Sequence, residues 1–157
     1  MIYVIYVKPS SEIEVCAKLQ NNNINAYAPV RKVLERNKGK WHEVTRIVFP
    51  SYVFVDVDLT DEIYYKVKNT DGVLRFLGKP PEPIRQAEAE HLYWIFEMQN
   101  IGISKGKLEN GRLVITDGAL VGKGSMITDY NSHTMRGWIH TKINGKNHKF
   151  SVTIDTR

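Results

Sequence analysis

The stretch from Phe49 to Asp58, FPSYVFVDVD, constrains the fold of this chain more than any other. Side chains alternate between the two faces of a β-strand, so one face carries three valines, Val53, Val55 and Val57. The other face carries two aromatic residues and two acids, Tyr52, Phe54, Asp56 and Asp58. One apolar face is enough to anchor a strand on a core. The aromatic residues therefore indicate that the strand is buried on both sides, or that its second face meets a partner.

Capping and breaking residues divide the first two thirds of the chain into alternating strands and helices. We expect strands within 2–7, 24–34, 41–58 and 73–77, and helices within 12–20, 61–68 and 86–98. The order β-α-β-β-α-β with a trailing helix is that of the ferredoxin-like split βαβ arrangement. Such a sheet has helices on one face only, which would leave Phe54 on an open face.

The composition and the pattern of apolar residues change after residue 99. Residues 100–111 are rich in glycine and poor in apolar side chains, which is typical of a flexible linker. Residues 112–157 contain short alternating stretches separated by turn signals, of which Asn144-Gly145 is a strong hairpin signal. The sequence predicts an α+β protein: a ferredoxin-like domain at 1–99, a linker at 100–111 and a small SH3-like β-barrel at 112–157.

The net charge of +5 is unevenly distributed. Residues 1–97 are balanced, and the whole excess lies in residues 98–157. Within the first part, residues 31–46 carry six basic residues against two acids. Two basic regions, one in each half, are consistent with an ordinary solvated surface or with a polyanionic partner such as nucleic acid.

No group of residues in the sequence has the pattern of a catalytic or metal site. The five histidines show no metal-like spacing, and the stretch 118–125, GALVGKGS, lacks the spacing and the following helix of a P-loop. We therefore expect no enzyme activity, no metal and no cofactor. Cys16 is the only cysteine, the N-terminus lacks a basic leader, and no apolar run has the length of a membrane span, which favours the cytoplasm and no membrane partner.

An RNA-recognition domain of the RRM type shares the predicted element order. Its third strand carries aromatic residues at positions that Tyr52 and Phe54 match here, although other positions of the pattern are replaced. Bases could then stack on three rings, Tyr3, Tyr52 and Phe54. One hypothesis is accordingly a two-module RNA-binding protein.

Several motifs occur together, in a fixed order, along the whole chain. They are IYVIYVKPSSE near the N-terminus, VFPSYVFVDVD, NTDGVLRFLG, LVITDGALVGKGSMITDY and KINGKNHKFSV. In this order they resemble the NusG family of transcription elongation factors, which has an NGN domain followed by a KOW barrel. Ile2 and Ser51 stand where the family usually has tryptophan and glycine.

The resemblance implies a monomeric accessory factor of RNA polymerase that suppresses pausing and promotes antitermination. The NGN domain of the family docks on the clamp helices of the largest polymerase subunit. Carried over by position, the implied anchors are four aromatic residues, Tyr6, Phe49, Tyr52 and Phe76. The basic tip at residues 36–40 would lie near upstream DNA.

Departures from the family pattern point to a specialised paralogue. Housekeeping members have Gly-Pro-Phe in the KOW loop, where this chain has Gly118, Ala119 and Leu120. The chain therefore resembles operon-specific factors of the LoaP or RfaH type more than a housekeeping NusG that acts with Rho, which stays an alternative. LoaP-like members recognise an RNA hairpin, so we expect contacts to a leader RNA from the two basic regions: Arg31, Lys32, Arg36, Lys38, Lys40, Arg46, Lys123, Arg136, His140, Lys142, Lys146 and Lys149.

Overall fold

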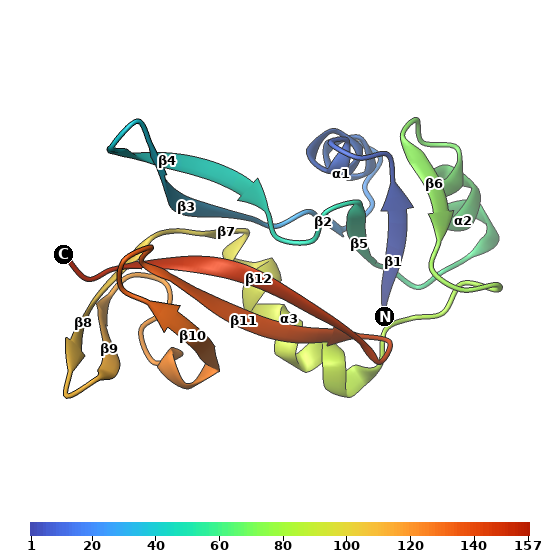
Figure 1. Ribbon diagram of the computed structural model, residues 1–157. Helices are drawn as coiled ribbons and strands as arrows, with labels where there is room; N and C mark the ends of the chain where they lie inside the picture. Colours follow the sequence, from blue (N-terminus) through green and yellow to red (C-terminus); the bar gives the residue numbers. More distant parts are fainter. The chain divides into compact units, whose positions relative to one another are not determined.

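The computed structural model describes all residues, 1–157, and the predicted α+β class is confirmed. Contacts divide the chain into two compact units (Figure 1). Unit 1 contains Met1–Pro29 and Ile47–Gln99, and unit 2 contains Val30–Arg46 and Asn100–Arg157.

Unit 1 is built on one four-stranded sheet in which every neighbouring pair is antiparallel. Its strands, in spatial order, are β2 (Ala26–Tyr27), β5 (Tyr52–Asp56), β1 (Ile2–Val7) and β6 (Val73–Phe76). Its helices are α1 (Glu12–Asn21), α2 (Asp61–Lys68) and α3 (Gln86–Met98). The predicted third helix is confirmed. Thr60 caps the N-terminus of α2, where its Oγ1 accepts the Ile63 N–H at 3.2 Å.

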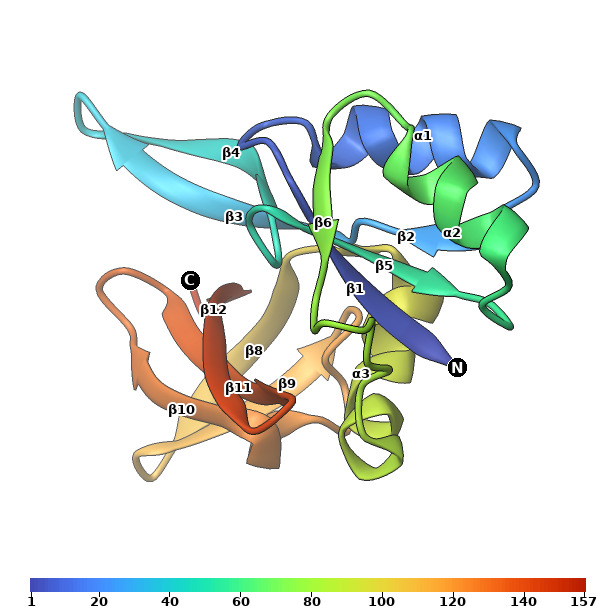
Figure 2. The ribbon, with the colours of Figure 1, turned by 90° about the vertical axis from the view of Figure 1, so that its right-hand side faces the viewer.

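Helices lie on both faces of the sheet in unit 1, and α3 covers only part of the second face. Val53 and Val55 face the core that α1 and α2 close. Phe54 points the other way, is fully buried, and has its ring centroid 4.8 Å from that of Phe96 in α3. Figure 2 shows α1 and α2 on one side of the sheet and α3 on the other. The expected open face was wrong around Phe54, because the trailing helix folds back over that part of the face.

A tight turn precedes β5 and fixes where that strand begins. Ser51 has a φ of +67°, in the left-handed region that favours glycine, which fits the glycine usual at this position in the resembling family. The buried carboxylate of Glu12 accepts the Ser51 N–H at 3.1 Å. The first turn of α1 therefore holds the backbone that presents Tyr52.

Unit 2 contains two sheets. The three-stranded sheet has the order β4 (Lys40–Ile47), β3 (Val30–Asn37) and β7 (Asn100–Ile101). The five-stranded sheet has the order β10 (Ile127–Asn131), β11 (Arg136–Ile143), β12 (Lys146–Asp155), β8 (Ser104–Glu109) and β9 (Arg112–Asp117). A single 3-10 turn, η1 (Gly124–Met126), precedes β10.

The β11–β12 hairpin forms as its sequence predicts. Asn144 and Gly145 have φ angles of +50° and +80°, the left-handed pair that a two-residue hairpin turn needs. The alternating side chains of β12, Phe150, Val152 and Ile154, are buried with at most 2% exposed. These residues are part of the apolar core of unit 2.

Residues 100–111, expected to be a linker, are mostly strand. β8 pairs with β9, and Ser104 and Lys105 pair with the end of β12. A Cβ on Gly106 would lie 2.6 Å from the Val114 carbonyl oxygen, so this glycine permits close packing. Asn110 and Gly111 have φ angles of +52° and +77° and form a hairpin turn. Gly106 therefore serves close packing and Gly111 serves a turn.

Residues 30–46, expected in the first domain, belong to unit 2. The Leu34 N–H donates to Thr153 Oγ1 of β12 at 3.1 Å, and Arg31 donates to Ser151 Oγ at 3.4 Å. β3 also runs parallel to β7, and Val33 is buried. The hairpin made of β3 and β4 thus lies beside β12 (Figure 1).

Replacing Gly118 by alanine is expected to lower the free energy of unfolding by about 2–4 kcal/mol. Gly118 has a φ of +101°, and a Cβ there would lie 2.8 Å from both Cα and Oγ of Ser104. Gly122→Ala is the matched control, because Gly122 has a φ of +80° but open space around it. Urea unfolding should show a clearly larger loss for Gly118→Ala, and equal losses would contradict the packing argument.

Candidate binding surfaces

Two tyrosines and an arginine form a cluster on the second face of the sheet in unit 1. Tyr6 of β1 pairs with Tyr52 of β5, and their ring centroids are 5.1 Å apart. Arg75 of β6 is also paired with Tyr6, and its guanidinium lies 4.4 Å from the centre of the Tyr6 ring. Both rings are half-buried and Arg75 is exposed. We call these three residues the tyrosine–arginine cluster.

The surroundings of Tyr52 in this cluster keep its hydroxyl neutral. Burial, together with the neighbouring Tyr6 hydroxyl, raises the pKa of Tyr52 to about 12. Tyr52 therefore remains a protonated phenol that donates or accepts hydrogen bonds at physiological pH. The cluster offers two aromatic rings with their hydroxyl groups and one cation in a small area.

The other two predicted anchors are buried. Phe76 is 5% exposed and faces the helices, where its ring stacks 5.3 Å from Tyr64 of α2. A direct contact between Phe76 and a partner therefore requires a movement that exposes its ring, and the expected contact stays a prediction. Phe49 is 3% exposed and packs edge-on against Phe54 at 5.2 Å. A direct role for Phe49 therefore requires a movement that exposes its ring.

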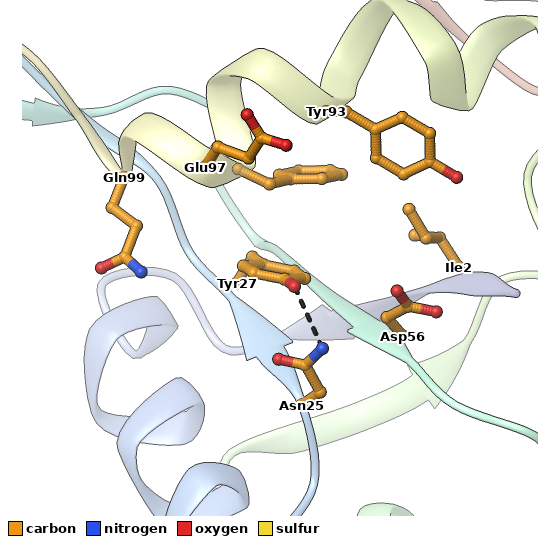
Figure 3. Close-up of a pocket in the computed structure, with 8 residues that line it drawn as sticks. Ile2, Asn25, Tyr27, Asp56, Tyr93, Glu97 and Gln99 are labelled. Carbon is orange, nitrogen blue, oxygen red and sulfur yellow. Dashed lines mark hydrogen bonds between the residues drawn. The ribbon is translucent and has the colours of Figure 1, made fainter.

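A pocket of about 360 Å³ lies where α3 crosses β2 and β5 (Figure 3). Tyr27 forms its floor, stacked on Phe96 at 5.0 Å, and the Tyr27 hydroxyl accepts a hydrogen bond from Asn25 Nδ2 at 3.0 Å. Of its two carboxylates, Asp56 is paired with the N-terminal ammonium group at 3.3 Å and Glu97 comes from α3. None of the predicted site residues lines this pocket.

The basic residues of the β3–β4 hairpin are partly engaged with acids. Arg46 forms a bidentate ion pair with Glu35, with a shortest distance of 2.8 Å, and Lys32 lies 3.7 Å from Glu43. Arg36 has its guanidinium 5.7 Å from the centre of the Trp41 ring. Lys38 and Lys40 are exposed at the turn. The tip of the hairpin thus carries the predicted residues with most access to solvent.

In unit 2 the outer face of β11 and β12 gathers most of the other predicted residues. The alternation of β11 places four side chains on that face, Arg136, Trp138, His140 and Lys142. Trp138 is half-buried, and the Lys149 ammonium of β12 lies 4.7 Å from the centre of its ring. His140 Nε2 is 3.1 Å from Thr128 Oγ1. Lys146 is exposed at the start of β12, whereas Lys123 lies apart, before η1.

Three arginines, which come from both parts of unit 2, place their positive charges near the carboxylate of Glu35. Burial, and then the charges of Arg136 and Arg46, lower the pKa of Arg31. The hydrogen bond from Arg46 holds the pKa of Glu35 below its usual value, so this carboxylate stays ionised. We call Arg31, Arg46 and Arg136 the arginine cluster. It unites the two basic regions that are far apart in the sequence.

A family model described as "Transcription termination factor nusG" matches residues 2–93. The chain belongs to the NusG family. The match covers all three strands of the sheet that carry the tyrosine–arginine cluster.

Named relatives agree with this assignment. The transcription termination/antitermination protein NusG of Helicobacter pylori is 28% identical over 125 residues, which are 76% of this chain and 70% of that protein. The NusG of Chlamydia trachomatis is 35% identical over 96 residues, 59% of this chain, and the match spans about half of that relative, 53%. A solved structure entitled "Domain interaction in Thermotoga maritima NusG" aligns with a TM-score of 0.56 at 18% identity, covering 97% of this chain and 92% of that one. That similarity shows the fold.

The structure of this NusG-family chain also places two residues in the candidate binding surfaces that the sequence did not predict, Arg75 and Trp41. Arg75 was not among the predicted binding residues. The available signal was its position in the strand of Val73, which pairs with the strand of Tyr6. Trp41 directly follows the basic turn at residues 38–40, and this position was the available signal for a ring beside the cations. The structure contains no group of three His, Cys, Asp or Glu side chains placed to hold a metal ion, and none of its helices is long and apolar enough to cross a membrane.

Proposed function

We propose that this protein is a cytoplasmic, non-enzymatic transcription elongation factor that binds RNA polymerase through the tyrosine–arginine cluster, suppresses pausing and promotes antitermination. Membership of the NusG family and the name of its relatives, transcription termination/antitermination protein, support this role. The observation that carries the proposal is the cluster itself, made by Tyr6, Tyr52 and Arg75 on three adjacent strands. The partner surface would be the clamp helices of the largest subunit, contacted by a monomer.

The chemistry of the cluster fits a protein partner. Tyrosine and arginine are enriched among the residues that dominate binding energy at interfaces. The Tyr52 ring is supported from one side, because the ring centroid of Phe54 lies 6.4 Å from that of Tyr52 and Phe54 is held by α3. A rigid aromatic patch loses little conformational entropy on binding, which favours affinity.

Tyr52→Ala is expected to weaken binding to isolated clamp helices by about 1–3 kcal/mol while the domain stays folded. The matched control is Tyr65→Ala, because Tyr65 is an exposed tyrosine of α2, 59% accessible, outside the cluster. Affinity measured by calorimetry or pull-down should fall for Tyr52→Ala and stay unchanged for Tyr65→Ala. Equal affinity in both variants would remove the cluster from the interface.

An RNA-binding protein without polymerase contact was the main alternative. The structure counts against its RRM form, since Phe54 is covered by α3 and Tyr3, 8% exposed, faces the helices. Neither ring is available for base stacking. Failure of the wild-type protein to bind the clamp helices would nevertheless favour that alternative over our proposal.

We further propose that the protein is an operon-specific factor that recognises a leader RNA hairpin and contacts upstream DNA. The support is the outward basic and aromatic face of β11 and β12 together with the arginine cluster. Lys142, Lys146 and the hairpin tip are exposed and suited to phosphate contacts. The departure of Ala119 and Leu120 from the housekeeping pattern supports the same specialised role.

A further inference from the structure

Besides the pocket of unit 1, a pocket lies in unit 2, where the β3–β4 hairpin meets the five-stranded sheet. It has a volume of about 310 Å³. The hairpin and the β10–β11 region both line it, with Leu34, Glu35, Arg36 and Trp41 from the first and His133, Thr134 and Arg136 from the second. This volume is near the lower end of small-molecule sites, about 300–1,000 Å³. The pocket therefore suits one small group rather than a helix or a strand.

The charge of the pocket favours an anion. Glu35 is its single carboxylate, and that carboxylate is already bound by Arg46 at 2.8 Å. Arg36 and Arg136 remain as cations of the lining, with Arg31 close enough to Arg136 for their charges to repel. The Nε of Arg136 is buried without a protein acceptor. A phosphate oxygen would satisfy this donor and relieve the repulsion.

An aromatic ring lies in the same pocket. Trp41 is half-buried, and only the guanidinium of Arg36 lies over its ring, at 5.7 Å from the centre. Arg36 is exposed, so its long side chain can turn towards a phosphate and leave the ring to another flat group. Tryptophan beside arginine is the combination that binds unpaired bases by stacking.

We propose that this pocket receives one unpaired nucleotide of a bound nucleic acid, with the base stacked on Trp41 and the phosphate held by Arg136 and Arg36. The inference rests on the proposed nucleic-acid-binding function and adds a subsite to it. A base within a continuous duplex cannot enter, because its faces are covered by its neighbours. The protein then distinguishes a hairpin with a bulged nucleotide from a fully paired stem.

The test compares two RNA probes, a short blunt duplex and the same duplex with one bulged uridine. The wild-type protein is expected to prefer the bulged probe by roughly 5-fold to 150-fold. Trp41→Ala should bring this ratio close to one without changing affinity for the blunt duplex, and Trp41→Phe should retain part of the preference. Tyr65→Ala is the control, since Tyr65 is an exposed aromatic residue of α2 that lies outside the pocket and outside the proposed RNA-binding face, and its loss should leave the ratio unchanged.

Arg136→Gln gives an independent variant that keeps the ring. It should lower affinity for the bulged probe several-fold more than for the blunt one, and thermal melting should show that each variant is folded. A DNA duplex with a bulged thymidine, compared with the blunt DNA duplex, tests whether the nucleotide comes from RNA or DNA. If the bulged-to-blunt affinity ratio is the same as for RNA, the pocket recognises base and phosphate alone. If the ratio is smaller for DNA, the pocket also recognises the RNA sugar.

Two results would overturn the inference in different ways. A wild-type ratio near one, with both RNA probes bound, would contradict the pocket and leave nucleic-acid binding standing. No binding of either probe at low salt would contradict the nucleic-acid part of the proposed function as well. Binding of the Trp41→Ala variant to the isolated clamp helices tests the proposed polymerase contact separately, because Trp41 is not part of the tyrosine–arginine cluster.

Discussion

Replacing Phe54 by alanine is expected to reduce the free energy of unfolding of unit 1 by about 3–5 kcal/mol. The ring is fully buried and lies between three aromatic side chains, with centroid distances of 4.8 Å to Phe96, 5.2 Å to Phe49 and 6.4 Å to Tyr52. Its removal leaves a cavity that α3 and the sheet cannot both close. Chemical unfolding followed by circular dichroism measures the loss.

Two neighbouring variants make this result specific. Tyr52→Ala, on the same face of the same strand but half-buried, should cost at most about 1 kcal/mol of stability. Phe96→Ala removes the partner ring and should reproduce most of the loss of Phe54→Ala, and the double variant should lose less than the sum. A small loss for Phe54→Ala would mean that α3 does not pack on this face in solution.

The strand that carries Phe54 shows what sequence reasoning reached. Alternation predicted which residues of β5 share a face, and the core around Val53 and Val55 confirms it. The sequence left open whether the second face is buried or meets a partner. In the structure this face differs along the strand, because Phe54 is buried under α3 and Tyr52 lies at its half-exposed end. Alternation gives the face of a residue, and only the docking of α3 decides which part of that face stays accessible.

Long-range contacts explain the errors at the boundaries of the units. The segment 100–111 has few apolar residues, so its pairing with β9 and β12 left no hydrophobic signal. The hairpin at residues 30–46 joins unit 2 through backbone and hydroxyl hydrogen bonds, such as Leu34 to Thr153, and these depend on residues more than 100 positions away. Local propensity carries no information about such contacts.

The candidate surfaces were predictable to different degrees. The basic residues of both regions were visible as charge clusters, and alternation along β11 placed Arg136, Trp138 and Lys142 on one face. The meeting of Arg31, Arg46 and Arg136 was not predictable, because it requires β3 to lie against β12. Phe76 was assigned to the partner surface from the resemblance, whereas the register of β6 turns it towards α2.

Binding of a leader RNA hairpin is expected to weaken steeply with salt. If about four to six phosphates are contacted, the log–log slope of affinity against salt should be roughly −3 to −5. Raising salt from about 50 mM to 200 mM would then reduce affinity by roughly 60-fold to 1,000-fold. The reason is the release of counterions from the phosphates that the basic side chains neutralise. Fluorescence anisotropy at several salt concentrations measures this slope.

Charge variants can divide the slope between the two basic regions. Lys38→Gln with Lys40→Gln removes the hairpin tip, and Lys142→Gln with Lys146→Gln removes two exposed cations of the five-stranded sheet. Each pair should make the slope shallower by roughly 1.5–2 if both of its cations contact phosphate. Lys18→Gln is the control for loss of a positive charge outside both basic regions, because Lys18 lies on α1 and is paired with Glu14 at 3.1 Å, and it should leave the slope unchanged.

Specific recognition requires a further difference between RNAs of equal charge. Stems are read largely by shape, and loops and bulges by their bases, so a hairpin and its scrambled sequence should share the salt slope but differ in affinity. Charge alone cannot produce that difference, because both RNAs carry the same number of phosphates. Equal and weak binding that vanishes near physiological salt would reduce the basic residues to a nonspecific role. The polymerase contact through Tyr6, Tyr52 and Arg75 would survive that result, whereas the operon-specific RNA recognition would not.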